Sequence, residues 1–355
     1  MAPVVTLELL KNAVLALSGA VLVLSLCLVL ERAIVALFRV RSGRREERLT
    51  QLVYRSVQVE PGNSPGLGVL SRFDRRSARG ILLRLAPDLR GDSGDAIGAL
   101  YRKLGFLRAD LVRLKSWRAT TRANAAADLG LVRVADALPA LLEAVNDPEV
   151  RVRQMAVWAI GQVGGPETVP VLIQLLGDPS RLVARRAQEV LAERGNETKD
   201  AILAYAEKTA SRAGRLAAIE LLGWLRMAEG ADLLLTFTSD MDPETRIKSL
   251  KAAAAIGDPR FMAVFHRGLE ESRWEVRCQA AKGLSLLGSP DSVPRLTTAL
   301  RDRVWWVRFY AATALAEVGP PGEEALHEAL DDPEQSVREM ARYLLERGEA
   351  VPALP

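Results

Sequence analysis

Hydrophobic and polar residues alternate along this chain with the period of an α-helix. Apolar residues recur three and four positions apart through most of the sequence after residue 70, which places them on one face of successive helices. No segment shows a convincing strand pattern, and Leu, Ala and Arg, which favour helices, are abundant. The pattern predicts an all-α protein.

One 31-residue pattern repeats through the latter part of the chain, from residue 117 onward. Its anchor is an arginine in the same phase of each repeat, with one alanine as the exception and a last step of 30 residues. A small residue follows each anchor by three positions and an apolar residue follows it by seven, on one helical stripe. The anchor positions are Arg122, Arg153, Ala184, Arg215, Arg246, Arg277, Arg308 and Arg338. The pattern predicts the first helix of each repeat.

Glycine and proline mark where these helices end and where second helices begin. A glycine often follows the apolar stripe, where a helix C-terminus needs a left-handed residue; examples are Gly164, Gly257, Gly288 and Gly319. Proline-containing segments at 165–170 and 289–294 then start a second helix, because proline in a first turn sacrifices no hydrogen bond. Asp-Pro pairs at 147–148, 178–179, 242–243 and 332–333 close the unit, with the aspartate placed to cap the next helix.

A two-helix unit of this length cannot fold alone. It buries too little apolar surface to offset its conformational entropy, so each unit must pack its stripe against the units on either side. Small rotations between successive units then accumulate into a superhelix with an extended concave face. We therefore predict a right-handed α-solenoid of about seven to eight helical hairpins, preceded by one transmembrane helix.

The N-terminal region predicts the membrane span. Residues 13–30 form an uncharged apolar run, and apolar residues resume at 33–38, which is enough helix to cross hydrocarbon of roughly 30 Å. A cleaved signal peptide is the alternative, disfavoured because a basic leader is missing and Glu31 and Arg32 stand where small residues mark cleavage. The excess of arginine after the span predicts a single-pass, N-out protein of the bacterial inner membrane with its repeats in the cytoplasm.

Charge is distributed unevenly along the chain. Residues 39–122 contain 19 basic and 8 acidic residues, a net charge of +11, which leaves −7 for the rest of a chain whose total is +4. We expect the arginines nearest the span to contact anionic lipid head groups; they are Arg39, Arg41, Arg44, Arg45 and Arg48. Nucleic-acid binding is the alternative, disfavoured because no base-stacking aromatic residues are interleaved with the basic ones.

These features divide the chain into five parts. We predict a transmembrane anchor at 1–40, a basic juxtamembrane helix and Pro/Gly linker at 41–70, and a helical N-terminal cap at 71–116. The repeat array follows at 117–348 and a C-terminal tail at 349–355.

Segments of the array resemble a known repeat family. The run from Trp274 to Leu284, followed by Leu287-Gly288-Ser289-Pro290, is similar to HEAT repeats of the bilin-lyase-like bacterial type, and the likeness extends over 117–348. Such repeats occur in protein-binding scaffolds, phycobilin lyases and deoxyhypusine hydroxylase. The resemblance therefore implies an architecture and leaves the activity open.

The anchor arginines and a set of aspartates predict a structural ladder. In the repeats that this chain resembles, an aspartate six positions before the arginine pairs with it within and between units. Because Ala184 breaks the series, we expect Asp178 to lack its usual partner. Anion binding is the alternative, disfavoured because the charge has a periodic partner. The predicted ladder comprises Asp147, Arg153, Arg215, Asp240, Arg246, Arg277, Asp302, Arg308 and Arg338, with Asp178 in the same slot and Asp332 in the shorter last step.

Candidate catalytic and metal-binding residues are few. The chain has two cysteines, Cys27 and Cys278, and two histidines, His266 and His327, so we expect neither a thiolate site nor a histidine-rich metal centre. His327-Glu328 is the only His-Glu pair, whereas resemblance to deoxyhypusine hydroxylase implies several such pairs holding two irons. We expect no enzyme activity, no cofactor and no small-molecule substrate.

Aromatic residues supply the candidate binding site. Trp274 and Trp305 share one position of the repeat, and Trp306 and Phe309 lie close to the second of them. Packing between repeats is the simpler interpretation, but an exposed cluster of these residues is typical of protein-binding surfaces.

The predicted function is that of a membrane-anchored HEAT-repeat scaffold or adaptor that binds protein partners through its second-helix faces. Resemblance to membrane-tethered HEAT-repeat proteins implies a role in assembling an envelope or polysaccharide-export complex. The alternative is a bilin-lyase-like or hydroxylase-like HEAT-repeat enzyme or enzyme accessory.

Overall fold

The computed structural model describes residues 30–32, 47–57 and 71–346 of the chain. Every regular element in these ranges is helical and none is a strand, which confirms the predicted all-α class. The chain divides into two compact units. The first contains the residues up to Arg113 together with Leu131–Val134, and the second contains Leu114–Gly130 and the residues from Ala135 onward.

The first unit contains a helical stretch at 47–57 and the helices α2 (Arg72–Leu85), α3 (Asp92–Lys103) and α4 (Phe106–Leu114). The stretch at 47–57 is amphipathic, with Leu49 and Val53 buried and Arg48 exposed. Helix α2 begins after Ser71, whose hydroxyl oxygen accepts a hydrogen bond from the amide of Asp74. The 31-residue repeat pattern is absent from this unit.

A buried carboxylate joins the three helices of the first unit. Asp110 of α4 is fully buried and accepts hydrogen bonds from Arg79 of α2 at 2.7 Å, from Arg113 of α4 at 2.6 Å and from the hydroxyl of Tyr101 of α3. A buried charge is tolerated only when it is paired and hydrogen-bonded, so this cluster constrains how the three helices pack. Nothing in the local sequence pattern predicted it, because Tyr101 and Arg79 lie 9 and 31 residues from Asp110.

The second unit is a row of seven helical pairs followed by α19 (Gln335–Glu346). The pairs are α5 (Ala119–Val132) with α6 (Leu138–Ala144), α7 (Val150–Val163) with α8 (Thr168–Leu175), α9 (Arg181–Arg194) with α10 (Lys199–Lys208), α11 (Arg212–Trp224) with α12 (Ala231–Phe237), α13 (Pro243–Ile256) with α14 (Met262–Gly268), α15 (Trp274–Leu287) with α16 (Val293–Ala299), and α17 (Trp305–Val318) with α18 (Pro320–Glu328). One-turn 3-10 helices precede most second helices and α19; they are η1 (Ala135–Ala137), η2 (Gly195–Thr198), η3 (Ala228–Gly230), η4 (Pro259–Phe261), η5 (Pro290–Ser292) and η6 (Ala329–Asp331).

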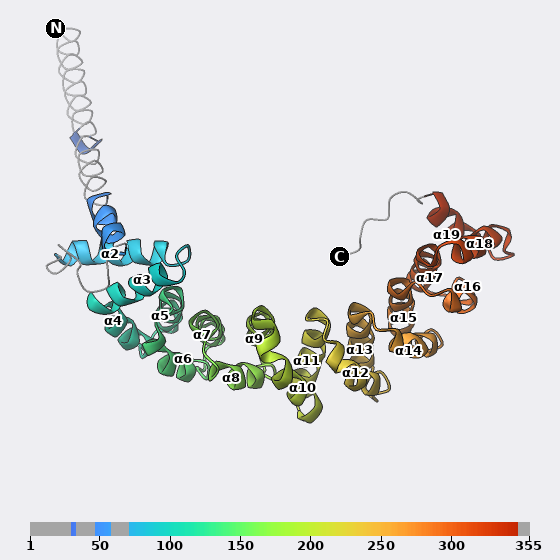
Figure 1. Ribbon diagram of the computed structural model, residues 1–355, viewed down its shortest axis with the longest axis horizontal. Helices are drawn as coiled ribbons and strands as arrows, with labels where there is room; N and C mark the ends of the chain where they lie inside the picture. The colour runs from blue at the N-terminus through green and yellow to red at the C-terminus, as the bar shows by residue number, and fades with distance from the viewer. Residues whose placement is uncertain (1–29, 33–46, 58–70, 347–355) are drawn as a thin grey trace, which may run out of the picture. The chain divides into compact units, whose positions relative to one another are not determined.

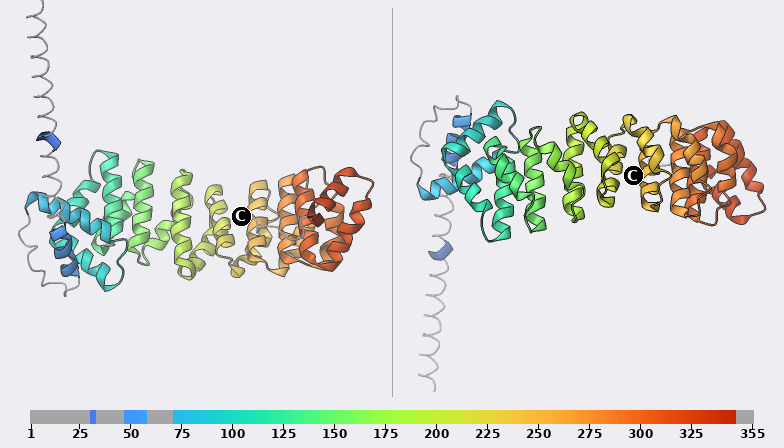
Figure 2. Two further views of the ribbon diagram at one scale, coloured as in Figure 1. Left: turned by 90° about the horizontal axis from the view of Figure 1, so that it is seen from above. Right: turned by 90° about the horizontal axis from the view of Figure 1, so that it is seen from below.

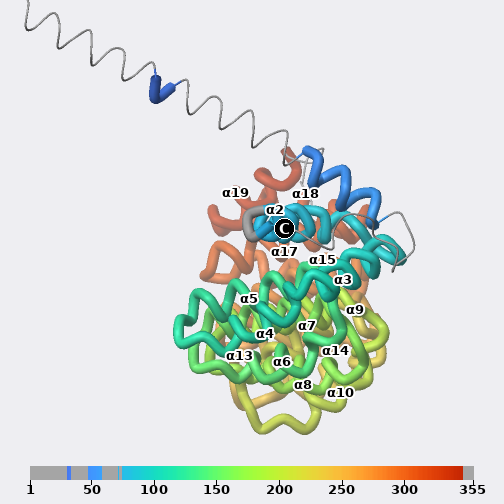
Figure 3. The backbone as a smooth tube through the Cα atoms, turned by 90° about the vertical axis from the view of Figure 1, so that its left-hand side faces the viewer, coloured from blue at the N-terminus to red at the C-terminus, as the bar shows by residue number. Residues whose placement is uncertain are grey.

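Within this unit the pairs form a curved row (Figure 1). The first helices α7, α9, α11, α13, α15 and α17 lie along its inner side, and the second helices lie along its outer side. The first helices run side by side across the row (Figure 2), and a view along the row shows successive pairs one behind another (Figure 3). The concave side is therefore formed by first helices, and the second-helix faces, where binding was expected, lie on the convex side.

The predicted apolar stripe forms the core of the row. All eight residues three positions after an anchor are fully buried: Ala125, Ala156, Ala187, Ala218, Ser249, Ala280, Ala311 and Ala341. The residues seven positions after an anchor are also fully buried, except Leu345 in α19. Helix α19 is the last described helix, and no further pair covers its far side within the described residues.

Helix ends follow the predicted signals. Gly257 and Gly288 end α13 and α15 in the left-handed conformation, with φ angles of 73° and 57°. Asp242 caps α13 through a hydrogen bond from the amide of Glu244, and Pro243 is the first residue of that helix. The chemistry of single residues therefore determines where the helices stop and start.

Most of the predicted N-terminal anchor lies outside the described residues. Of the span at 13–30 only Leu30 is described, and Arg39, Arg41, Arg44 and Arg45, the Pro/Gly linker and the tail at 349–355 also fall outside. Among the helices that are described, none combines the length and apolar character needed to cross a bilayer.

We expect Leu284→Asp to destabilise the array cooperatively. Leu284 of α15 is fully buried, so an aspartate there places an unpaired charge in the core and lowers the free energy of unfolding by more than about 3 kcal/mol. Thermal unfolding followed by far-UV circular dichroism measures the loss. Leu286→Asp, two residues away in the same helix at a position that is 60% exposed, is the matched control and should leave Tm nearly unchanged. Equal Tm values for the two variants would contradict this packing.

Candidate functional site

The anchor arginines connect consecutive repeats. Arg277 donates from Nε and Nη2 to the two carboxylate oxygens of Asp302, at 2.5 and 3.0 Å, and from Nη1 to the carbonyl of Glu271 at 2.8 Å. Asp302 lies 25 residues later, in the loop before the next first helix, and Glu271 lies in the loop before the arginine's own helix. One guanidinium thus holds two successive loops through charge-assisted hydrogen bonds.

Two further rungs have the same geometry. Arg122 binds both oxygens of Asp147 at 2.6 and 2.8 Å, and Arg153 binds both oxygens of Asp178 at 3.0 and 3.1 Å. Each aspartate also accepts the amide hydrogen two residues later, for example that of Glu149 at 2.9 Å. The carboxylate therefore holds the start of one helix and the arginine of the preceding one.

The rung carboxylates are held in their ionised form. Burial acts to raise the pKa of Asp302, but hydrogen bonds from Arg277 and from the Val304 amide outweigh it and leave the pKa below its ordinary value. Burial and the Arg122 hydrogen bond oppose each other at Asp147 in the same way, with the same net lowering of the pKa. Each of these carboxylates is neutralised by an arginine, so the ladder has a structural role.

The remaining rungs are looser. Arg215 approaches Asp240 at 3.5 Å and Arg246 approaches Glu271 at 3.6 Å, and the Nε atoms of both arginines are buried without a hydrogen-bond partner among the described residues. Among the described residues, the last two anchor arginines make backbone contacts alone: Arg308 donates to the carbonyl of Asp302 and Arg338 to that of Asp332. The carboxylate of Asp332 pairs with Arg301 instead.

The predicted pairing scheme requires two corrections. The aspartate six positions before an arginine contributes its backbone carbonyl, and the side-chain partner is the aspartate 25 positions after the arginine. Asp178 therefore does have a partner, Arg153, contrary to prediction. Ala184 instead leaves position 209 without an arginine, and this position holds Thr209, whose hydroxyl accepts the amide hydrogen of Ser211 at 3.1 Å. Thr209 therefore accepts the same amide hydrogen bond as the aspartates of the other loops, but it carries no charge.

The structure assembles an aromatic surface on α17 and α19. Trp305 stacks on Phe309 at 5.1 Å between ring centroids, and Trp306 meets Trp305 edge-on at 4.7 Å. Tyr310 lies 5.4 Å and Tyr343 of α19 lies 6.3 Å from Phe309. Trp306 is 50% exposed, and Trp305 and Tyr343 are also exposed. We call these five residues the aromatic surface.

Three of the four predicted aromatic residues lie together in this surface. Trp274 is exposed at the start of α15, but it makes none of the ring contacts found among the described residues of the surface. Tyr310 and Tyr343 escaped prediction. The helical spacing of Trp306 and Tyr310 was a usable signal for the first, whereas Tyr343 joins only through the packing of α19 on α17.

Cys278 and Lys282 of α15 lie beside this surface. The Lys282 ammonium is 5.7 Å from the centroid of the Tyr310 ring, a cation–π geometry. Cys278 is buried, and burial raises the pKa of its thiol to about 11. The thiol is therefore protonated and unreactive at neutral pH.

A polar network crosses three first helices in the middle of the row. Glu220 of α11 accepts hydrogen bonds from Lys248 of α13 and, at 3.1 Å, from Gln188 of α9. Burial acts to raise the pKa of Glu220, but these two hydrogen bonds outweigh it and lower the pKa. Arg185 of α9 lies 4.2 Å from the ring centroid of Trp224 of α11. The charges of Glu220 and Lys248 therefore neutralise each other within the network.

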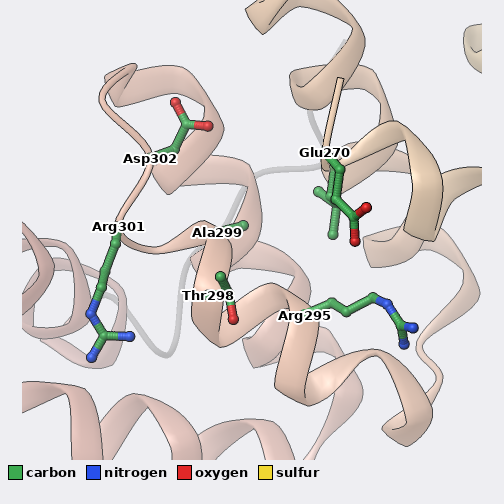
Figure 4. Close-up of a pocket in the computed structure, with 7 residues that line it drawn as sticks. Glu270, Arg295, Thr298, Ala299, Arg301 and Asp302 are labelled. Atoms are coloured by element: carbon green, nitrogen blue, oxygen red, sulfur yellow. The ribbon is translucent and has the colours of Figure 1, made fainter. Parts of the chain in front are cut away.

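An open pocket of about 360 Å³ lies between the end of α14 and α16 (Figure 4). It is lined by Leu269, Glu270, Arg295, Thr298, Ala299, Arg301 and Asp302. Asp302 is engaged by Arg277 and Arg301 by Asp332, and the Thr298 hydroxyl donates to the carbonyl of Pro294. The lining has mixed charge and no paired nucleophile and base.

His266 does not form an accessible reactive pair. His266 Nε2 lies 2.9 Å from the Ser292 hydroxyl oxygen, but Ser292 is fully buried. Burial, followed by the charge of Arg295, lowers the pKa of His266. No group of three His, Cys, Asp or Glu side chains in the described part of the chain is placed to hold a metal ion.

The family model of HEAT repeats matches residues 111–192, 199–270 and 262–346, which is more than half of the chain. The chain belongs to the HEAT-repeat family. No curated protein matches it.

Three solved structures are similar to this HEAT-repeat chain at low identity. An engineered protein is 18% identical over 87% of this chain and 96% of its own, with a TM-score of 0.39. The CpcE–CpcF complex of phycocyanin lyase from Nostoc sp. is 18% identical over 67% and 94%, with a TM-score of 0.33. Human deoxyhypusine hydroxylase in complex with glycerol is 22% identical over 87% and 98%, with a TM-score of 0.29. At these identities and TM-scores the likeness carries no conclusion about this chain.

We expect Arg277→Met to destabilise the array, because it leaves the Asp302 carboxylate half-buried without its charged partner. The expected loss in the free energy of unfolding is roughly 3 kcal/mol. Urea denaturation followed by circular dichroism measures it. Arg342→Met, at an exposed position of α19, is the control and should change stability little. A stability equal to that of the control would remove the ladder's structural role.

Acid should weaken the array through the rung carboxylates. The pKa values of Asp147 and Asp302 in the folded state lie below the unfolded value of about 3.9. Their stabilisation is therefore complete above that pH and is lost as the pH falls through the folded pKa values. We expect Tm to stay level from about pH 7 to 5 and to fall below about pH 4. The fall should be smaller in Asp302→Asn than in Asp331→Asn, an exposed control; identical pH profiles would contradict this assignment.

Proposed function

We propose that this chain is a HEAT-repeat scaffold that binds protein partners and carries no catalytic activity. Its right-handed array is tethered by the N-terminal segment to the bacterial inner membrane, N-out, and presents its concave side to partners in the cytoplasm. Assembly of an envelope or polysaccharide-export complex is the role that this arrangement suits.

The observation that carries the proposal is the aromatic surface. Exposed tryptophan and tyrosine leave a large apolar area in water, and burying such rings is the main source of energy at protein interfaces. Trp306 and Tyr343 come from successive first helices, so a partner that covers both is also positioned along the row. A scaffold must both hold its partner through apolar contacts and orient that partner along the row.

The internal pairing of polar groups favours binding over catalysis. Asp302 is paired with Arg277 and Glu220 with Lys248, so these carboxylates are not free to act as acid or base on a substrate. The alternative, a lyase-like or hydroxylase-like enzyme or accessory, requires groups that are turned toward a substrate.

The charge distribution supports the tether. The uncharged run at 13–30 is followed by six arginines up to residue 48, and exposed arginines continue on α2 at Arg75, Arg76 and Arg84. Anionic lipids attract such residues when they lie within a Debye length of the membrane. A span together with basic residues gives a stronger attachment than either alone.

We expect Trp306→Ala to weaken partner binding at unchanged stability, because Trp306 is half exposed in the aromatic surface. The full chain, in detergent-solubilised membranes, is cross-linked to its partner, which is then identified, purified and titrated. The expected loss of affinity is about 30-fold. Trp117→Ala is the matched control, since Trp117 is 83% exposed and lies outside the aromatic surface.

Equal affinity of the two variants for the purified partner would contradict the assignment of the binding surface. The tether is tested on the same membranes. The full chain should stay in the pellet after washes with high salt and with alkali, whereas release by salt alone would contradict a membrane span.

A further inference from the structure

The junction between α9 and α11 lacks the charged rung found at the other junctions from α5 to α17; at the α17–α19 junction Asp332 pairs with Arg301 instead. An arginine would stand at position 184 and an aspartate at 209, but the chain has Ala184 and Thr209. The other junctions from α5 to α17 each have an arginine facing an aspartate or glutamate 25 residues later. Both partners are replaced together, so no unpaired charge is left at this junction.

Tyr205 of α10 occupies the space between the two loops of this junction. A Cβ atom added to Gly177 would lie 3.1 Å from the Tyr205 hydroxyl oxygen, and one added to Gly214 would clash with it. Gly177 directly precedes Asp178 in one loop, and Gly214 lies just after the start of α11. An uncharged ring thus stands where a guanidinium would bind both loops.

Helices α9 and α11 also pack less closely than their neighbours. Of the adjacent first-helix pairs from α7 to α17, this pair has the least extensive contact, and it is no larger than that of α19, the last described helix, on α17. Gly161 of α7 faces Val190 of α9, and Gly223 of α11 faces Ala252 of α13, at distances too short for any added Cβ atom. The equivalent positions in α9 and α11 are Ala192 and Leu221, and this bulkier pair requires a wider separation of the helix axes.

The contacts that remain at this junction lie further along the helices. Gln188, one turn after Ala184, donates to the carbonyl of Ala217 at 2.9 Å and to Glu220 at 3.1 Å. A half-exposed ion pair between Lys199 and Glu229 at 3.2 Å links α10 to η3. Single hydrogen bonds from an uncharged side chain and an exposed ion pair contribute less than a bidentate, mostly buried ion pair.

We propose that the α9–α11 junction is the joint of the array. The helices from α5 to α10 form one cooperative block and those from α11 to α19 form another, because stability in a stacked array depends on the interfaces between nearest neighbours. Bending at this joint changes the curvature of the concave side without breaking either block. The joint does not depend on the proposed function, since it follows from contacts inside the array.

Hydrogen exchange of the full chain at increasing urea concentrations, followed by mass spectrometry of peptides, tests the joint. We expect peptides from α5 to α10 and peptides from α11 to α19 to lose protection in two separate steps. Protection at the facing ends of α9 and α11 should be roughly tenfold below that at α15 and α17, the effect of one missing charged rung. A single common step for all peptides would overturn the proposal.

Two variants move the joint. Ala184→Arg combined with Tyr205→Ser and Thr209→Asp installs a rung and should merge the two steps into one, with Tyr205→Ser alone as the control. Arg277→Ala combined with Asp302→Thr transfers the α9–α11 arrangement to the α15–α17 junction and should create a second boundary there. If the first variant does not fold, the hydrogen-exchange profiles of the wild type and of the second variant still test the proposal. Unchanged boundaries in the second variant would show that the rungs do not determine where the array divides.

Discussion

Burial of one apolar stripe between neighbouring helices is the constraint on which the rest of this structure depends. The stripe consists of small residues three positions after each anchor and larger ones seven positions after it, and nearly all of them are inaccessible to water. No pair of helices could bury its own stripe, so each repeat is stable only between two others. The stacking of the pairs into a row follows from this requirement.

The arginine ladder fixes the relative position of neighbouring repeats, which the apolar packing alone does not. Apolar contacts tolerate some sliding of one helix over another, whereas a guanidinium that holds a carboxylate and a carbonyl at once sets the relative position of two loops. Arg277, with Asp302 on one side and Glu271 on the other, shows the complete arrangement. Where the pair is absent, at Ala184 and Thr209, the array keeps its stripe and loses that constraint.

The repeats carry two kinds of surface chemistry, paired charges and exposed aromatic rings. Several charged residues of the first helices are paired across junctions, as Glu220 is with Lys248 and Arg153 with Asp178. The aromatic surface differs because its rings stack on each other and still leave apolar area exposed. This contrast is the physical reason that we propose binding at the end of the row near α17 and α19 and a structural role for the ladder.

The sequence by itself determined the helical class, the repeat length, the buried stripe and the positions of helix-ending residues such as Gly257. These features depend on contacts between residues close in sequence or one repeat apart, and periodicity records such contacts directly. Only the tertiary structure decided which carboxylate each arginine meets, that Asp178 pairs with Arg153, and that Tyr343 completes the aromatic surface. Several loops offered a carboxylate in the right register, and the choice between them depends on the angle at which one helical pair stacks on the next. That angle results from side-chain packing over the whole interface and has no local signal in the sequence.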